Sequence, residues 1–323
     1  MCQKRIKRIL SIQSHVSYGY VGNRAATFPL QLLGWDVDAV NTVNFSNHAG
    51  YRNFSGTKVT PAELNGMLDT MEENGMMGQS YILTGYIPGA ESLSIVKRYI
   101  ERIKRDSGAT YLLDPVMGDD DRVYVNSDVI PVYKSMLYLA DLITPNAFEV
   151  QLLTDIKLIT KEDVQHALHI LHTQYGVRNV VITSIGFGED GCLSTIMSAH
   201  EHDTHTRQLQ YPLIEGYYSG VGDIFSALLV ANYEAATVDM KNCSEIDILT
   251  HATEKTVASI QAVLSNTRQY AAKILPADID VDIDKDTDNK RRIERQRARE
   301  LRLIQSQDEL KHPVITHRAT PFV

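Results

Sequence analysis

The sequence has little cysteine, a single tryptophan and no long apolar run. Three cysteines among 323 residues cannot build a disulfide scaffold, so we expect reduced thiols and a cytoplasmic location. The basic N-terminus is followed by a short apolar stretch, residues 9–12, which is too short for a signal-peptide core. No segment approaches the roughly 18 apolar residues that cross a bilayer, so no membrane contact is expected.

An excess of positive charge is also missing. Acidic side chains outnumber basic ones, 40 to 32, and the net charge of −8 argues against a nucleic-acid partner. Glycine and proline, at 19 and 10, are at ordinary levels, and 43% of the residues are hydrophobic, which predicts a globular protein with a large core. The sequence contains no P-loop motif of the form GxxxxGK followed by Ser or Thr.

Short apolar runs alternate with longer helical patterns, which predicts an α/β fold. Several runs are almost continuously apolar and end on a polar residue, as is typical of parallel strands buried on both faces. We therefore expect a mainly parallel central sheet with helices on both faces, a Rossmann-like three-layer sandwich. The expected strands are 8–13, 37–43, 80–84, 110–114, 142–144 and 179–184. The expected helices are 23–33, 61–74, 90–105, 129–140, 147–153, 161–174, 224–236 and 245–275.

Two motifs resemble ligand sites but have the wrong context. Gly186, Gly188 and Gly191 match a dinucleotide fingerprint, yet a strand-like run follows them instead of a helix, so we expect a hairpin turn. His200, His202 and His205 could ligate a metal, but their segment is polar throughout and is expected to be a solvated loop.

The composition changes after Pro276. Aspartate recurs at every second position from 278 to 288, and a basic run from 290 to 302 follows. The tail from 277 carries ten acidic and ten basic residues, so the whole net charge belongs to 1–276. We expect a solvated acidic linker and then a solvated helical face, with nuclear localisation as the alternative reading of the basic run. The expected division is a main domain at 1–276, a charged, flexible insert at 277–299, and a segment at 300–323 that packs back on the main domain.

The strongest chemical signal is the sequence SGVGD at 219–223, which precedes an amphipathic helix. Glycines let backbone N–H groups approach an anion, and a helix N-terminus adds partial positive charge. Asp223 could be a cap or a catalytic group. Asp114 and Glu149 follow two other strands, where they could be turn and capping residues. Together the three carboxylates suggest a site for Mg²⁺ and a nucleotide.

Eight motifs in the same order resemble the pyridoxal kinases, the vitamin B6 branch of the ribokinase-like superfamily. They are SIQSHV at 11–16, GYVGNRAATFPLQ at 19–31, FSNHAGY at 45–51, LTGY at 83–86, DPV at 114–116, ITPNAFE at 143–149, VITS at 181–184 and GVGD at 220–223. The resemblance spans about 9–275 and resumes at 300–323. It implies a ribokinase-like fold and ATP-dependent phosphorylation of the 5′-hydroxymethyl group of pyridoxal, pyridoxine and pyridoxamine.

The resemblance also implies roles for individual residues. Asp223 matches the catalytic base, and Gly220, Val221 and Gly222 match the anion hole, with Ser219 beside it. The substrate pocket is matched by Ser14, Val21, Phe45 and Tyr86. The nucleotide site is matched by Asp114, Asp119, Tyr124, Thr144, Asn146, Glu149, Thr183 and Ser184. Asp119 and Tyr124 belong to a flap over ATP, and Asp114 and Glu149 are the implied metal ligands.

Two positions depart from the family pattern. Val221 replaces a common threonine, which removes a hydroxyl contact to phosphate, and Ala49 replaces a threonine found in some relatives near the substrate. The implied cofactors are ATP with Mg²⁺ or another divalent ion, with K⁺ as a candidate, and the implied assembly is a homodimer. The alternatives are a related hydroxymethylpyrimidine kinase and a vitamin B6 carrier that has lost catalysis.

Overall fold

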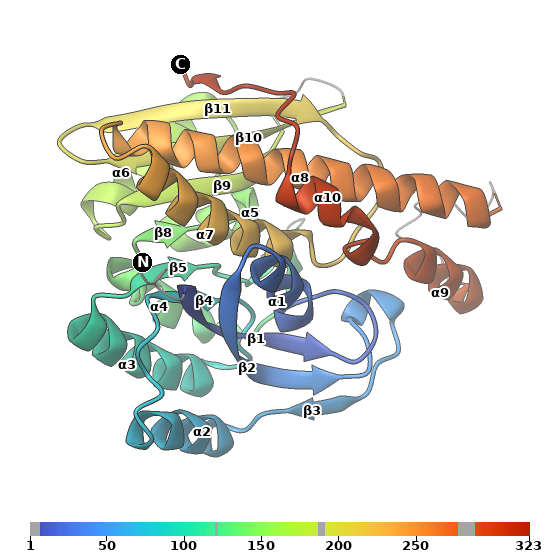
Figure 1. Cartoon of the computed structure of the whole chain (residues 1–323), viewed down its shortest axis with the longest axis horizontal. Coiled ribbons are helices and arrows are strands. Elements are labelled where there is room, and N and C mark those ends of the chain that lie inside the picture. Colours follow the sequence, from blue (N-terminus) through green and yellow to red (C-terminus); the bar gives the residue numbers. More distant parts are fainter. Residues whose placement is uncertain (1–6, 120–121, 187–190, 277–287) are drawn as a thin grey trace, which may run out of the picture.

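A ten-stranded sheet forms the centre of the molecule (Figure 1). The computed structural model describes residues 7–119, 122–186, 191–276 and 288–323. The strand order is β12-β11-β10-β9-β8-β5-β4-β1-β2-β3. Six neighbouring strands are parallel, as predicted: β1 (Lys7–Val16), β2 (Trp35–Phe45), β4 (Tyr81–Thr84), β5 (Thr110–Leu113), β8 (Leu142–Ile143) and β9 (Asn179–Ile185). The antiparallel strands at the two edges are β3 (Gly56–Lys58), β10 (Cys192–His200), β11 (Thr204–Pro212) and β12 (Thr320–Pro321).

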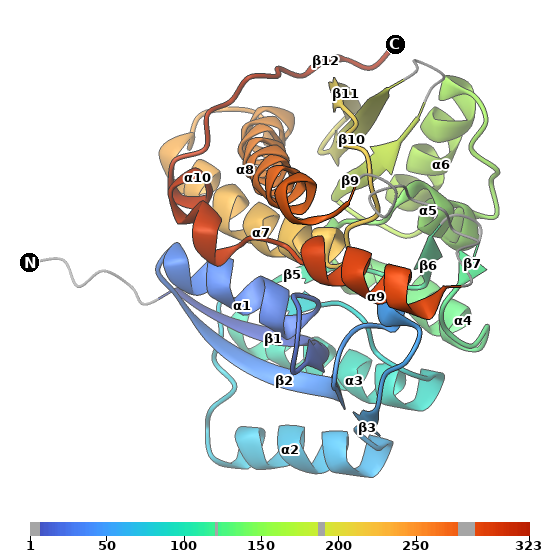
Figure 2. The ribbon, with the colours of Figure 1, turned by 90° about the vertical axis from the view of Figure 1, so that its right-hand side faces the viewer.

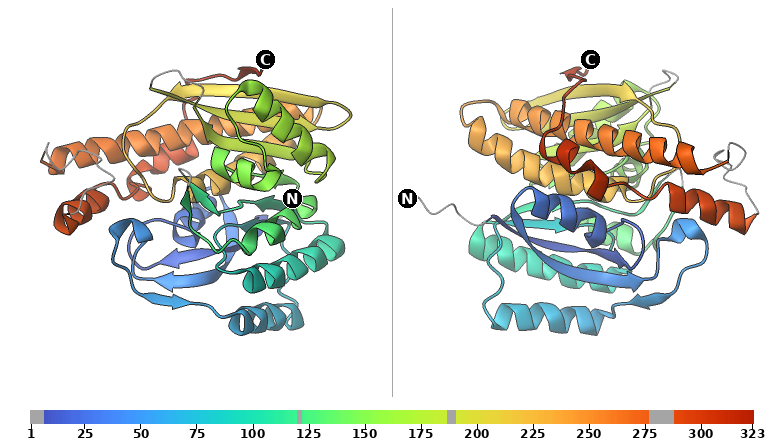
Figure 3. Two further views of the ribbon diagram at one scale, coloured as in Figure 1. Left: turned by 180° about the vertical axis from the view of Figure 1, so that it is seen from behind. Right: turned by 45° about the vertical axis from the view of Figure 1, so that its right-hand side comes forward.

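Helices cover both faces of the sheet, so the predicted three-layer sandwich is confirmed (Figures 2 and 3). Neighbouring strand residues point to opposite faces: Leu10 joins one core cluster and Ile9 the other. The first cluster packs under α2 (Pro61–Glu73), α3 (Ala90–Ser107), α4 (Val129–Lys134), α5 (Ala147–Thr154) and α6 (Lys161–Thr173). The second packs under α1 (Asn23–Leu32), α7 (Val221–Asp239) and α8 (Glu245–Ile274).

Local sequence signals set several element boundaries. Helix α2 begins where expected, because Thr60 and Glu63 form a capping box and Pro61 occupies the first turn. The helix expected at 129–140 is shorter: α4 ends at Lys134 and a 3₁₀ turn, η2 (Leu137–Leu139), follows. Both pieces bury apolar side chains, and this burial accounts for the helical pattern read over the whole segment.

The two misleading motifs lie in antiparallel hairpins. Strands β9 and β10 pair antiparallel on either side of the glycine motif, as a hairpin turn requires, while 187–190 lie outside the described residues. The histidine loop is shorter than predicted, because His200 and His205 belong to paired strands and only 201–203 turn. Within the described ranges, no group of three or more His, Cys, Asp or Glu side chains is placed to hold a metal ion.

The C-terminal segment runs over the α7 and α8 side of the molecule (Figure 1). It forms α9 (Asn289–Ala298), a 3₁₀ turn η3 (Ile304–Ser306) and α10 (Gln307–Lys311). The prediction of a solvated helical face is wrong for one side of α9: Arg295, Gln296 and Arg299 are only 3%, 8% and 4% exposed. They face the main body, which a charge count cannot reveal. The aspartates from 278 to 286 lie outside the described residues. None of the helices that the structure describes is both long and apolar enough to span a membrane.

Candidate functional site

Two adjoining pockets open at the carboxyl ends of the parallel strands, where ligands bind in sheets of this kind. Their volumes are 790 and 360 Å³. They share six lining residues, Val116, Asp119, Tyr124, Tyr217, Ser219 and Asp223, so a group bound in one pocket can reach a group bound in the other.

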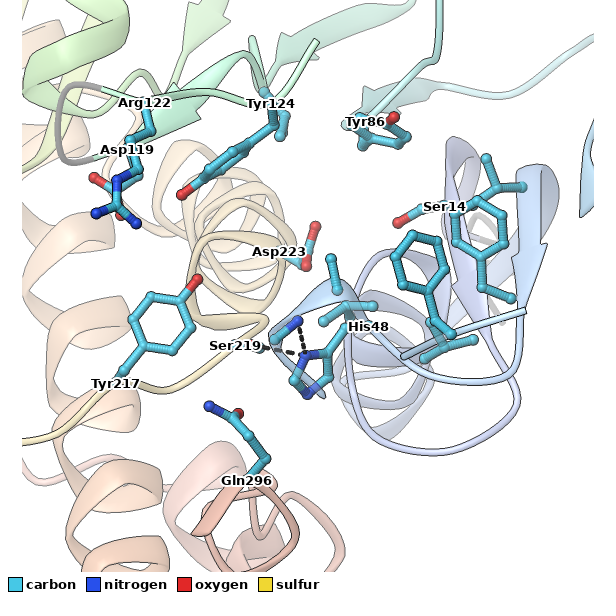
Figure 4. A pocket seen from close by; sticks show the side chains of 18 of the residues that line it. Ser14, His48, Tyr86, Asp119, Arg122, Tyr124, Tyr217, Ser219, Asp223 and Gln296 are labelled. Atoms are coloured by element: carbon cyan, nitrogen blue, oxygen red, sulfur yellow. Dashed lines mark hydrogen bonds between the residues drawn. The ribbon is translucent and has the colours of Figure 1, made fainter. Parts of the chain in front are cut away.

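The larger pocket has apolar and aromatic side chains on part of its wall and charged or polar side chains on the rest. Ser14 from β1, Phe45 from β2, Val21 and Tyr86 all line it, as the sequence analysis placed them together. Figure 4 shows Asp223 between Ser14 and Tyr86 on one side and Asp119 and Tyr217 on the other. Such walls suit a flat aromatic ring whose polar substituents meet a few hydroxyl and carboxylate groups.

The smaller pocket is lined by both polar and apolar side chains. It collects the predicted residues Asp114, Thr144, Asn146, Glu149, Thr183, Ser184 and 219–222. Its apolar side chains come from β10, β11 and α8, include Leu193, Tyr211, Val257 and Leu264, and had no signal in the sequence. A pocket with both kinds of wall can hold an aromatic base together with charged groups.

The turn before α7 can bind an anion. Gly220 is the N-cap of this 19-residue helix and has φ 87°, a left-handed conformation that glycine adopts without strain. A Cβ atom on Gly220 would also collide with the carbonyl oxygen of Tyr20. Gly220, Val221 and Gly222 line the smaller pocket, so the unpaired N–H groups of a helix start and the positive end of the helix dipole lie at that pocket.

Asp223 lies in that first turn and lines both pockets. Burial raises the pKa of its carboxyl group to about 6, and a hydrogen bond from the backbone of Gly22 opposes part of this rise. The carboxylate is therefore ionised at neutral pH and more basic than an ordinary aspartate. This matches the requirement for a general base.

Asp114 and Glu149 form a buried acidic pair that lines the smaller pocket, with 5% and 3% exposure. Burial raises the pKa of Glu149 to about 8, against backbone hydrogen bonds from Asn146 and Met117, both 2.9 Å long. Burial and the charges of Glu149 and Asp223 raise the pKa of Asp114 well above its usual range. A bound cation would favour both ionised forms.

Ser226 is a polar site neighbour that the sequence analysis missed. Its hydroxyl group donates to Asp114 Oδ2 at 2.8 Å and lies 2.9 Å from the Thr144 hydroxyl. Ser226 is in α7, one helical turn after Asp223, so a helical projection from that residue could have suggested it.

A small hairpin covers the junction between the two pockets. Strands β6 (Gly118–Asp119) and β7 (Arg122–Val123) pair antiparallel, and Tyr124 N donates to Met117 O at 2.8 Å. Asp119 and Tyr124, which the sequence analysis expects in a flap, line both pockets. Residues 120 and 121 lie outside the described ranges.

The C-terminal helix α9 supplies a wall that the sequence analysis assigned to solvent. Arg292, Arg295 and Gln296 line the larger pocket, and Arg292 Nε donates to Gly50 O at 2.7 Å. Arg295 and Gln296 follow Arg292 by three and four residues, and this spacing was a usable signal for one helix face. Nothing in the sequence said which surface this face would meet.

The chain is similar to known proteins over most of its length. A family model described as phosphomethylpyrimidine kinase matches residues 39–263. The chain is 34% identical over 321 residues to pyridoxal kinase of Arabidopsis thaliana, covering 98% of this chain and 94% of the relative. It is 35% identical over 335 residues to pyridoxal kinase of Bos taurus, covering 97% and 98%. A solved structure of pyridoxal kinase from Leishmania donovani in complex with ADP and pyridoxamine is 32% identical, with a TM-score of 0.82 and coverage of 98% of this chain and 99% of that chain.

Proposed function

The chain belongs to the pyridoxal kinase family and is an ATP-dependent kinase of vitamin B6, and we propose that Asp223 is its catalytic base. The carboxylate takes the proton of the 5′-hydroxymethyl group of pyridoxal, pyridoxine or pyridoxamine. The alcohol oxygen forms a bond to the γ-phosphorus of ATP, the bond to the β-phosphate oxygen breaks, and ADP leaves. The position of Asp223 at the junction of the two pockets is the observation that carries this assignment.

Each pocket is assigned one reactant. The larger pocket takes the pyridine ring against Val21, Phe45 and Tyr86, with Ser14 as a polar contact. The smaller pocket takes ATP, with the base against apolar side chains of β10, β11 and α8 and the phosphates toward Gly220 and the first turn of α7. The alcohol and the γ-phosphoryl group then meet beside Asp223, and much of the catalysis comes from this positioning.

The remaining nucleotide contacts are assigned by their place in the smaller pocket. Thr144, Thr183 and Ser184 offer hydroxyl groups at the strand ends, and Asn146 lies at the start of α5. Asp119 and Tyr124 cover the phosphates from the β6–β7 hairpin. Ser219 precedes the anion hole, where Val221 contributes its backbone N–H group in place of a threonine hydroxyl.

Asp114 and Glu149 fit a Mg²⁺ ion that arrives with ATP. Mg²⁺ is held in proteins by one or two carboxylates, and water and phosphate oxygens complete its shell. The buried acidic pair supplies such carboxylates, and within the described ranges no larger group of ligands forms a protein-only cage. The ion would neutralise charge on the phosphates. K⁺ stays a candidate, and replacing K⁺ by Na⁺ in the assay tests it.

A related hydroxymethylpyrimidine kinase is the second candidate, because the matching family model carries a phosphomethylpyrimidine kinase description. Full-length similarity to pyridoxal kinases favours the B6 vitamers. Comparing kcat/KM on pyridoxal and on hydroxymethylpyrimidine decides between them, and a higher value on the pyrimidine would reverse the assignment. A carrier without catalysis would bind pyridoxal in calorimetry yet form no ADP.

The base assignment is tested by Asp223→Ala with Asp239→Ala as the matched control. Asp239 is the last residue of the same helix and is exposed, so its replacement leaves the site untouched. We expect Asp223→Ala to lower kcat by at least about 100-fold, because general base catalysis contributes 10²–10⁴-fold. Near-normal turnover of Asp223→Ala with ATP and Mg²⁺ would refute the assignment.

The organisation of the protein remains a proposal in three respects. We assign the proposed base, anion hole and metal ligands to 1–276, while α9 adds a wall of the larger pocket. The segment 300–323 packs on the main domain, since Leu301, Leu303 and Leu310 join the core cluster of α7 and α8. The charged insert 277–299 includes α9. Sedimentation analysis tests the proposed homodimer, and cell fractionation tests the cytoplasmic location and the nuclear alternative.

A further inference from the structure

Glu300 connects three segments that are far apart in the sequence. It follows α9, and its side chain is only 12% exposed. Oε1 accepts hydrogen bonds from the Tyr51 hydroxyl at 2.8 Å and pairs with His48 Nε2 at 3.1 Å, while Oε2 accepts from Tyr20 N at 3.2 Å. Burial and the charge of Glu300 raise the pKa of Tyr51, so this hydroxyl stays protonated and donates. One carboxylate therefore holds the β1–α1 turn and the substrate loop, which we define as residues 48–51.

The hydrogen bonds around His48 assign the tautomer of its imidazole ring. Gly50 N–H donates to Nδ1 at 3.2 Å, so Nδ1 accepts and Nε2 carries the proton toward Glu300. The Ser219 hydroxyl lies 3.2 Å from Nδ1 and donates to the same lone pair, which it shares with Gly50 N–H (Figure 4). Glu300 orients the imidazole ring, and the imidazole ring orients Ser219.

Two routes lead from Glu300 to the anion hole. The first runs through His48 to Ser219, the residue before Gly220. The second runs through Tyr20, whose N–H group binds Glu300 and whose carbonyl oxygen packs directly against Gly220. The carboxylate also packs closely on the turn, since a Cβ atom on Gly19 would lie 2.5 Å from its oxygens. The same group thus supports the proposed phosphate-binding turn from two directions.

The C-terminal segment makes a second hydrogen-bonded contact with the substrate loop. Arg292 Nε of α9 donates to the carbonyl oxygen of Gly50 at 2.7 Å. His48, Ala49 and Gly50 line the larger pocket, whereas Glu300 is not among the lining residues of either pocket. Any effect of Glu300 on the reaction must therefore pass through the residues it holds.

We propose that Glu300 is a positioning residue for phosphoryl transfer, which fixes the substrate loop and the Ser219–Gly220 turn relative to each other. This inference rests on the proposed roles of Gly220 and Asp223. Small displacements at a reacting centre can cost about 100-fold in rate. A residue outside both pockets thereby sets the geometry between the alcohol and the phosphate.

The test compares Glu300→Ala and Glu300→Gln with Glu309→Ala as the matched control. Glu309 belongs to the same C-terminal segment but packs on α8, where it contacts Asn266. We expect Glu300→Ala to lower kcat/KM for pyridoxal at least about tenfold, by loss of position, while Glu309→Ala stays within about twofold of the parent. The kcat/KM of Glu300→Gln should lie between those of Glu300→Ala and the parent. The amide oxygen can still accept from His48 and Tyr51, but the amide NH₂ group, a donor, faces the Tyr20 N–H group.

A double-mutant cycle with Ser219→Ala separates positioning from general destabilisation. If Glu300 acts through His48 on Ser219, the loss in Glu300→Ala with Ser219→Ala should be at least about threefold smaller than the product of the two single losses. Two results would overturn the proposal. One is a double variant whose loss in kcat/KM equals the product of the two single losses, and the other is a kcat/KM for Glu300→Ala equal to the control's. If the alanine variant fails to fold, Glu300→Gln replaces it in the cycle. The cycle keeps Asp223 intact, so an error in the base assignment would appear only in the Asp223→Ala experiment.

Discussion

Ser226, one turn after Asp223 in helix α7, donates a 2.8 Å hydrogen bond to Asp114 at the end of strand β5. The bond joins the helix that carries the proposed base to the strand end that carries a proposed metal ligand. It also lowers the pKa of Asp114, against the rise that burial and the neighbouring carboxylates cause. Ser226 therefore favours the ionised form of a buried carboxylate at the place where we propose that a cation binds.

Replacing Ser226 by alanine should weaken the use of Mg²⁺ and ATP. The change removes a hydrogen-bond donor from the buried Asp114 carboxylate and so raises its pKa further. Leaving a buried acceptor without this partner costs about 1–3 kcal/mol of free energy. We expect the Mg²⁺ concentration for half-maximal activity to rise at least about fivefold, as measured by ADP formation. Ser259→Ala in α8 is the control, because Ser259 is also buried but donates to Glu309 O at 3.1 Å, outside both pockets. An unchanged Mg²⁺ requirement would contradict a role of Ser226 in cation binding.

The activity should increase with pH through the titration of Asp223. A base works only when ionised, and burial raises the pKa of this carboxyl group to about 6. Below that pH the group is protonated, so log kcat/KM for pyridoxal should fall with unit slope as pH decreases and level off above about pH 7. A steady-state pH profile measures this, with circular dichroism at each pH to confirm folding. A flat profile between pH 5 and 7 would contradict the role of Asp223.

Gly220→Ala should abolish most activity for two physical reasons. The left-handed φ of 87° strains any residue with a Cβ atom, and that atom would collide with Tyr20 O. Displacing this turn moves the proposed anion hole, so we expect kcat to fall at least about 100-fold. The kcat of Gly222→Ala should fall less, because a Cβ atom at that position meets nothing within 4 Å. Thermal unfolding separates lost activity from lost folding, and equal activity of the two variants would exclude the steric explanation.

Periodicity and end signals predicted much of the architecture. The six parallel strands are all present, because each is an apolar run of strand length that can be buried on both faces. The start of α2 was predictable because the capping box of Thr60 and Glu63 joins residues only three positions apart. Local signals failed at 129–140, where buried side chains of a short helix and a 3₁₀ turn gave the pattern of one long helix.

The motifs located the pocket walls well, since every residue that the resemblance implied lines one pocket or both. These residues occur in short sequence segments with a recognisable composition, such as the glycines and Asp223 at the start of α7. The division into two pockets was not predictable in the same way. It depends on the register of strands and on side chains from α8 and β11 that have no chemical signature of their own.

The sequence by itself determined the alternation of strands and helices, the acidic groups at the strand ends and the glycine turn proposed to bind phosphate, because these depend on neighbouring residues. Only the tertiary structure decided what the basic run does. A row of arginines has the same local preference whether it meets water or protein, and here its buried face completes a pocket wall. Glu300 received its role in the same way: its contacts with Tyr20, His48 and Tyr51 join residues about 250 to 280 positions apart, and only folding brings them within hydrogen-bond distance.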